Sequence, residues 1–282
     1  MKKATLIVAL IMSSAAFSQK NLKISEIHIS SGSGSMGTQD GTLSDFAKLA
    51  PNSAILGMDL SQLTPYNFNY YNGFGMNSGS SSTSLQLGLQ CAKMPKITFR
   101  VGLTHVNNFG LLSAHGSFYE SAPYDTLTSS QTGQQTLIDS SHTKSYDMNY
   151  SNQQIRLDGA LIFRMFPEKR WSLHAGLGAS IGMSYRASTS LRYWESSSIN
   201  SNTGGYYNES GKNETFKNKN SLGAALYIPL GLDFCIGKKR EFWMPFHLYA
   251  EARPSLNINS INGIGTTFSP GMSSALGLRV KI

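Results

Sequence analysis

Most of the chain consists of segments in which apolar and polar residues alternate with a period of two. The clearest segment covers residues 171–185, where one face is apolar and the other carries serine, glycine and histidine. Trp171 and Tyr185 end the apolar face, where aromatic girdles lie at the two interfaces of a membrane. This alternation predicts a β-strand with one apolar and one polar face.

Seven further segments repeat the pattern, at residues 22–31, 85–90, 97–103, 153–166, 222–236, 244–253 and 272–282. In the first of them Leu22 and Ile24 are out of phase with Ile27 and Ile29, so we expect a β-bulge between the two pairs. Short polar turns and long polar connections alternate between the segments. The turns cover 93–96, 167–170 and 237–242, and the long connections cover 32–81, 119–150, 187–219 and 258–267.

This arrangement predicts an all-β protein, an antiparallel eight-stranded transmembrane β-barrel with long extracellular loops and both termini in the periplasm. Only helices and closed barrels satisfy their backbone hydrogen bonds in hydrocarbon. No apolar run reaches the ~20 residues that a transmembrane helix needs. The alternative, a soluble β-sandwich or lipocalin, also has alternating strands, but it does not explain the asymmetry between short and long connections.

The first residues of the chain have the pattern of an export signal. Lys2 and Lys3 precede an apolar run, and small residues flank Phe17 before Gln19. We expect residues 1–18 to be a signal peptide and residues 19–282 to be a barrel domain in the cell outer membrane. The net charge of +8 becomes +6 without the two lysines. In an exported protein this charge indicates contact with anionic headgroups of outer-membrane lipid, or charges that are balanced inside the protein, and not contact with nucleic acid.

The last residues, 275–282, resemble the C-terminal assembly signal of outer-membrane barrels, in which hydrophobic residues follow a glycine at fixed offsets. Gly277, Val280 and Ile282 match, whereas the family usually has a polar residue at the position of Ala275 and an aromatic residue at the end. With its eight segments, the chain is similar to OmpA-type and OmpX-type barrels and to uncharacterised outer-membrane barrels of Bacteroidota. The resemblance implies that the C-terminal strand binds the barrel assembly machinery.

The inward positions of the predicted strands carry charged residues. An eight-stranded barrel is only wide enough for side chains to fill it, and a buried charge without a partner costs several kcal/mol. We therefore expect a paired charge network inside the barrel and no channel. Its expected members are Arg100, Arg156, Asp158, Arg164, Asp233, Glu251, Arg253 and Arg279.

The first class of function is a non-enzymatic barrel whose surface loops serve in binding, adhesion or a structural role. Aromatic and amide side chains are concentrated in residues 65–72, a mixture that suits a surface glycan or a protein ligand. The expected ligand-binding residues are Tyr66, Phe68, Tyr70 and Tyr71. Alternatively, these rings pack the first loop against the barrel.

The second class is an enzyme that modifies lipid A. His115, Ser117 and Glu120 resemble the His-x-Ser pair and acid of lipid A deacylases, in which histidine activates the serine hydroxyl and a carboxylate orients the histidine. Glu120 follows more closely than in that family, and a histidine near the membrane interface is ordinary, as it is for His105. We therefore expect no enzyme.

Other features add detail. The six histidines lack His-x-His or HExxH spacing, so we expect no metal and no cofactor.

Cys91 and Cys235 are expected to be free, buried thiols on opposite sides of the barrel. Thr42 and Asp45 form a capping-box pattern that predicts a short helix over the barrel mouth. The Ser-, Thr- and Gln-rich run 127–141 is expected to be a mobile hydrophilic screen.

Overall fold

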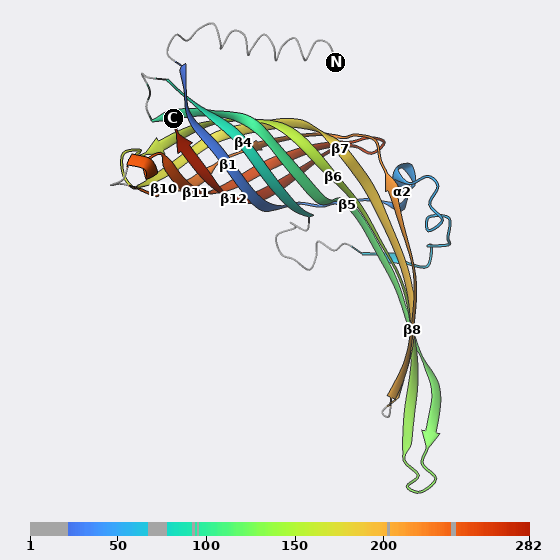
Figure 1. Ribbon diagram of the computed structural model, residues 1–282. Helices are drawn as coiled ribbons and strands as arrows, with labels where there is room; N and C mark the ends of the chain where they lie inside the picture. The colour runs from blue at the N-terminus through green and yellow to red at the C-terminus, as the bar shows by residue number, and fades with distance from the viewer. Residues whose placement is uncertain (1–21, 67–77, 92–93, 95, 202–203, 238–240) are drawn as a thin grey trace.

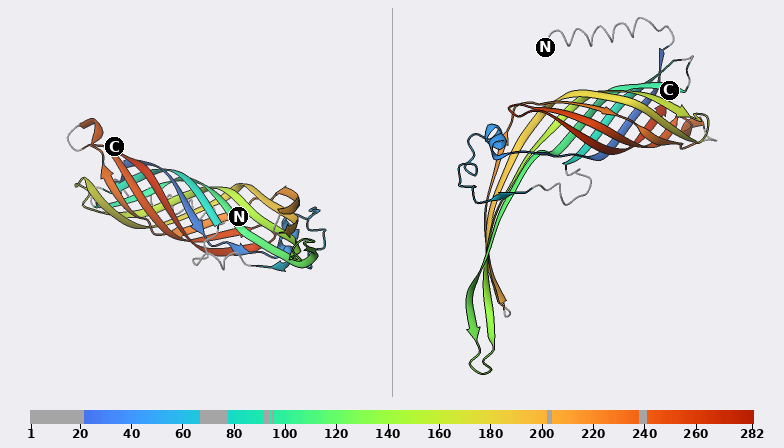
Figure 2. Two further views of the ribbon diagram at one scale, coloured as in Figure 1. Left: turned by 90° about the horizontal axis from the view of Figure 1, so that it is seen from below. Right: turned by 180° about the vertical axis from the view of Figure 1, so that it is seen from behind.

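A computed structural model describes residues 22–66, 78–91, 94, 96–201, 204–237 and 241–282 of the chain (Figure 1). The expected signal peptide lies outside the described residues, as do Phe68, Tyr70 and Tyr71. The described part is dominated by one antiparallel sheet that is rolled into a barrel (Figures 1 and 2).

The barrel wall has eight positions, one of which is shared by two consecutive strands. The wall strands are β1 (Leu22–Met36), β4 (Ser78–Cys91), β5 (Ile97–Thr128), β6 (Gln135–Met165), β7 (Trp171–Ser201), β9 (Leu222–Tyr227) with β10 (Leu230–Cys235), β11 (Phe246–Ile261) and β12 (Gly265–Lys281). Both β9 and β10 pair with β7 on one side and β11 on the other. Pro229, which has no N–H to donate, lies between them.

Pairing continues round the ring without a gap, so the barrel is closed. The order is β1, β4, β5, β6, β7, β9 with β10, β11 and β12. β12 then pairs with β1 from Glu26 opposite Lys281 to Met36 opposite Gly271. The register between β1 and β4 shifts between Ile24 and Glu26, which confirms the predicted bulge. The chain is thus an all-β, antiparallel, eight-stranded barrel, as predicted.

The outer wall of the barrel is apolar because alternate residues of each strand point outward. Leu177 on β7 and Leu276 on β12 are 69% and 72% exposed, whereas Ser180 and Ala275 point inward and are buried. Such a continuous apolar surface is costly in water and is the surface that lipid acyl chains solvate. The fold is that of a transmembrane β-barrel.

Beyond the barrel, β5, β6 and β7 continue and join β8 (Gly204–Lys217) in a four-stranded sheet ordered β5-β6-β7-β8. We call this sheet the arm; it comprises residues 112–150, 186–201 and 204–217. Register shifts at residues 109–111 of β5 and at Tyr185 of β7 mark where it leaves the barrel. Bulges bend strands, and the arm curves away from the barrel axis (Figure 1).

The arm corrects two expectations. The connections 119–150 and 187–219 are long, but most of their residues are in β-strands. The run 127–141 belongs to the ends of β5 and β6 and the turn between them, not to an irregular screen. Serine and threonine side chains on both faces of these strands hide the two-residue period, since the arm has no lipid-facing side.

Residues 37–66 form a lid at the arm end of the barrel (Figure 1). Its helix α2 (Leu43–Leu49) begins after Thr42, whose hydroxyl accepts from the backbone N–H of Asp45 while the Asp45 carboxylate accepts from the Thr42 N–H. The predicted capping box and helix are confirmed. None of the described helices is long and apolar enough to cross a membrane.

The lid is held by strand pairing and by an apolar core. β2 (Gln39–Asp40) and β3 (Thr64–Pro65) pair with β5. The short 3-10 helix η2 (Glu241–Trp243) is not part of the lid, since it lies between β10 and β11 at the opposite end of the barrel (Figure 1). Phe46 of α2 and Ile55 are fully buried in a cluster that includes Leu112 and Met148 of the arm and Ile261 of β11. The lid therefore joins the arm to the barrel rim.

The cysteines are free, as predicted, but both are partly exposed rather than buried. Cys91 ends β4 and Cys235 ends β10, on opposite sides of the ring. Their exposure follows from these positions, because each thiol lies where its strand enters a turn.

We expect Leu177→Arg to destabilise the folded barrel by about 2–4 kcal/mol, because it places a charge on the lipid face near mid-strand. Leu137→Arg is the matched control: Leu137 is 66% exposed, but on the arm, where a surface substitution should change stability by less than about 0.5 kcal/mol. Urea titrations in lipid vesicles measure both. Equal effects of the two substitutions would contradict the assigned lipid face.

Candidate functional site

All eight predicted network residues are buried in the barrel interior. Six of them form ion pairs, but among the described residues Arg156 and Asp158 have no partner of opposite charge within 4.0 Å, so the prediction of a paired network is wrong for these two. In one cluster the Glu26 carboxylate accepts hydrogen bonds from Arg164 and Arg279, each at 2.6 Å. Arg279 also donates to Asp233 at 2.8 Å, and His247 Nδ1 lies 2.7 Å from the same carboxylate oxygen. Glu26 was not predicted as a member, although the bulge between Ile24 and Glu26 turns its side chain inward.

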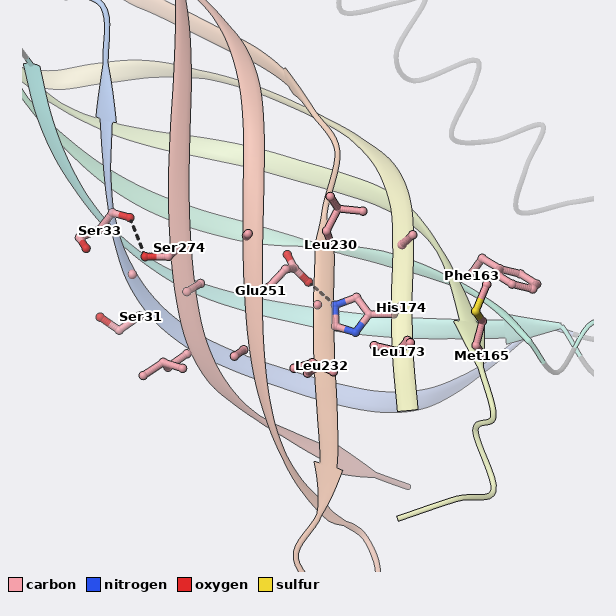
Figure 3. Close-up of a pocket in the computed structure, with 17 residues that line it drawn as sticks. Ser31, Ser33, Phe163, Met165, Leu173, His174, Leu230, Leu232, Glu251 and Ser274 are labelled. Atoms are coloured by element: carbon pink, nitrogen blue, oxygen red, sulfur yellow. Dashed lines mark hydrogen bonds and ion pairs between the residues drawn. The ribbon is translucent and has the colours of Figure 1, made fainter. Parts of the chain in front are cut away.

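A second interior cluster is centred on Glu251 of β11. This carboxylate accepts from Arg100 at 2.8 Å and from Arg253 at 2.5 Å, and His174 Nε2 lies 2.8 Å away. Figure 3 shows the contact between His174 on β7 and Glu251. These three partners compensate the negative charge of the buried Glu251 carboxylate. Because they come from β5, β7 and β11, the cluster joins three wall strands.

The three residues of the alternative, enzymatic hypothesis, His115, Ser117 and Glu120, do not come together. Alternation along β5 places His115 and Ser117 on one face and Glu120 on the other, where it is exposed. The acid beside His115 is instead Asp147, directly opposite on β6, with 3.8 Å between His115 Nδ1 and Asp147 Oδ2. His105 is exposed on the outer wall, with its Nε2 2.9 Å from the Tyr185 hydroxyl.

His115 instead contributes to a pocket of about 500 Å³ between the lid and the arm. Tyr66 of the lid stacks on His115, with 5.7 Å between ring centroids and 29° between the ring planes. Tyr146 of β6 forms a further wall, and Asp40 and Ser44 provide polar groups at the lid side. We call this hollow the lid–arm pocket.

The aromatic walls of the lid–arm pocket are hydrogen-bond donors at neutral pH. Burial raises the pKa of the Tyr66 hydroxyl, and the nearby Asp147 carboxylate raises it further. Burial also raises the pKa of Tyr146. A β-carbon at Gly116 would overlap the Tyr146 ring, so this glycine lets the ring lie across β5.

Of the predicted ligand-binding residues, only Tyr66 lies in the described part of the chain. It is exposed and borders the lid–arm pocket. Tyr146 was not predicted, because the polar residues around it resemble a loop. Its only signal in the sequence is an aromatic ring within a polar connection.

Two other features carry no site. One hollow, of about 1240 Å³, lies beside the outward-facing Leu173, Leu230 and Leu276 of the barrel wall, a surface of the kind that lipid acyl chains solvate (Figure 3). Among the described residues, no group of three or more His, Cys, Asp or Glu side chains is arranged to hold a metal ion.

We expect Glu251→Gln to destabilise the barrel by about 3–5 kcal/mol, because it leaves buried arginines without their counter-charge. Glu209→Gln on the exposed face of β8 is the control and should have little effect. Urea unfolding in vesicles compares the two variants with the wild type. A harmless Glu251→Gln would mean that the network does not stabilise the barrel.

No protein-family model matches the chain, and no curated protein matches its sequence. Among solved structures, the chain is similar to Neisserial surface protein A, with 9% identity, a TM-score of 0.41, and coverage of 93% of this chain and 100% of that one. It is also similar to Ail, the attachment invasion locus protein of Yersinia pestis, in complex with the heparin analogue sucrose octasulfate. That match has 12% identity, a TM-score of 0.23, and coverage of 92% and 100%. Both TM-scores are below 0.5, so the fold is assigned from the closed sheet of this chain and not from these likenesses.

Proposed function

We propose that this chain is an exported outer-membrane barrel that binds a surface ligand in the lid–arm pocket and catalyses no reaction. The pocket itself carries the proposal. Its volume of about 500 Å³ lies within the roughly 300–1,000 Å³ of small-molecule sites, which are likewise mostly apolar with a few placed polar groups. In this proposal the signal peptide is residues 1–18, the lid and arm face the outside, and the C-terminal strand binds the assembly machinery.

A glycan is the ligand that best suits the chemistry of the lid–arm pocket. The exposed ring of Tyr66 offers a flat face to the C–H face of a sugar, and its protonated hydroxyl can donate to a sugar oxygen. The Asp40 carboxylate and the Ser44 hydroxyl can accept hydrogen bonds from sugar hydroxyls. This combination of ring stacking and convergent polar groups supports glycan binding over binding of a purely apolar ligand.

Deacylation of lipid A is less well supported. A catalytic hydrogen bond between an acid and histidine spans about 2.6–3.2 Å, whereas 3.8 Å separates His115 from Asp147. The residues also lie on the arm, beyond the apolar wall where acyl chains are found. Both observations favour binding over ester hydrolysis.

The proposed location has a direct test. The protein should fractionate with outer membranes and migrate faster on gels before boiling than after it, because a closed barrel resists detergent until it is heated. Recovery from the soluble periplasm would contradict the proposal.

The binding site is tested with Tyr66→Ala. We expect this change to weaken glycan binding about tenfold, or about 1.4 kcal/mol, because it removes one stacking face while the barrel stays folded. Tyr119→Ala is the matched control, since Tyr119 is 68% exposed on the arm and does not line the pocket. A glycan array followed by titration of the best ligand provides the measurement.

Three results would overturn the proposal. The first is an equal loss of glycan binding in both tyrosine variants. The second is the absence of glycan binding by the wild type, with capture of a protein ligand instead. The third is acyl release from purified lipid A that His115→Ala abolishes, which would establish the enzyme.

A further inference from the structure

The barrel lumen contains a polar cavity of about 80 Å³. Every position of the eight-stranded wall contributes to its lining, so the cavity is central and not a surface groove. Hydroxyl and amide groups, such as those of Ser82, Ser180 and Asn257, share this lining with Arg156, Arg253 and Asp158. We call it the lumen cavity.

Among the described residues, Arg156 differs from the other interior arginines because no carboxylate forms an ion pair with it. Arg100, Arg164, Arg253 and Arg279 each lie within 2.8 Å of a glutamate or aspartate oxygen. In the part of the chain that the structure describes, no carboxylate lies within the 4.0 Å limit of an ion pair with Arg156. Its Nε donates to the neutral amide of Gln154 at 2.7 Å, and its buried Nη2 has no partner. Arg156 is only 4% exposed.

Asp158, the nearest candidate to compensate Arg156, is engaged elsewhere. Its carboxylate accepts from Gln86 at 3.1 Å, from the Tyr227 hydroxyl at 2.5 Å and from Thr104 at 3.5 Å. These three neutral donors hold the Asp158 carboxylate in place, and the carboxylate forms no ion pair with the guanidinium of Arg156. The charges that line the lumen cavity are therefore Arg156 and Arg253 against Asp158, a net charge of +1.

The same excess is found for the whole interior. Among the described residues, the buried charged side chains are five arginines and four carboxylates, so with neutral histidines their net charge is +1. His28, His174 and His247 each contact one of these carboxylates, and protonation of any of them would only add positive charge. A buried charge without a counter-charge costs several kcal/mol.

We propose that the lumen cavity binds one monovalent inorganic anion of halide size, which supplies the missing counter-charge of Arg156. A single water molecule needs about 10–15 Å³ of cavity, so 80 Å³ accommodates a halide ion with several waters. The serine and asparagine groups complete its coordination as hydrogen-bond donors. The net charge of +1 favours a monovalent over a divalent anion, and Asp158 excludes further negative charge.

The proposal is tested with chloride on the full-length barrel in lipid vesicles. Chloride is varied against gluconate, which is too large for the cavity, at constant ionic strength so that screening does not change. A ligand that binds only the folded state stabilises it increasingly with concentration. We expect the urea midpoint of the wild type to rise with chloride, and the midpoint of Arg156→Gln to be independent of it.

Arg186→Gln, which removes an exposed arginine, is the control and should respond to chloride as the wild type does. A wild-type midpoint independent of chloride, or an equal chloride response in Arg156→Gln, would overturn the proposal. If Arg156→Gln does not fold, wild-type crystals grown in bromide decide the question. An anomalous peak beside Arg156 supports the site, and a cavity that contains water alone refutes it.

Discussion

The need to pair every backbone N–H and C=O group within hydrocarbon determines the rest of this structure. It closes the sheet into a ring, and a ring of eight strands leaves a lumen that side chains fill. Large inward side chains then require small neighbours: a β-carbon at Gly178 would overlap Tyr227, and one at Gly277 would lie 2.5 Å from the Tyr249 ring. Charged side chains in so narrow a space lie against one another, and most of those in the described interior form ion pairs, with Arg156 and Asp158 as the exceptions.

The fold was predictable from the sequence wherever each strand has one face in lipid and one in the lumen. There the two environments differ enough to impose a two-residue period, as in residues 171–185 of β7. Even the bulge between Ile24 and Glu26 was predictable, because a change of phase within a strand needs an extra residue. In the arm, polar residues occur on both faces of the strands, and the pattern that would identify β5 and β6 beyond the barrel is hidden.

The candidate site was predictable only in part. Tyr66 was identified from the aromatic residues around it, and His115 from a motif whose acid, Glu120, lies on the opposite face of β5. The lid–arm pocket arises because β2 and β3 pair with β5, which brings residues 40–44 and 64–66 against the arm. That pairing depends on contacts between segments distant in sequence, and a local pattern does not encode it.

The continuity of β5 and β6 from the barrel wall into the arm has a mechanical consequence. A pull on the turn at residues 129–134, directed away from the barrel, stretches both strands along their length. The force then reaches the wall, where β5 pairs with β4 and β6 pairs with β7 through hydrogen bonds perpendicular to the strands. To extract β5 and β6 from the wall, the pull must slide them past β4 and β7, which breaks many of these hydrogen bonds at once. Peeling a strand sideways would instead break them one at a time. The arm is thus anchored in the membrane in the geometry that best resists tension.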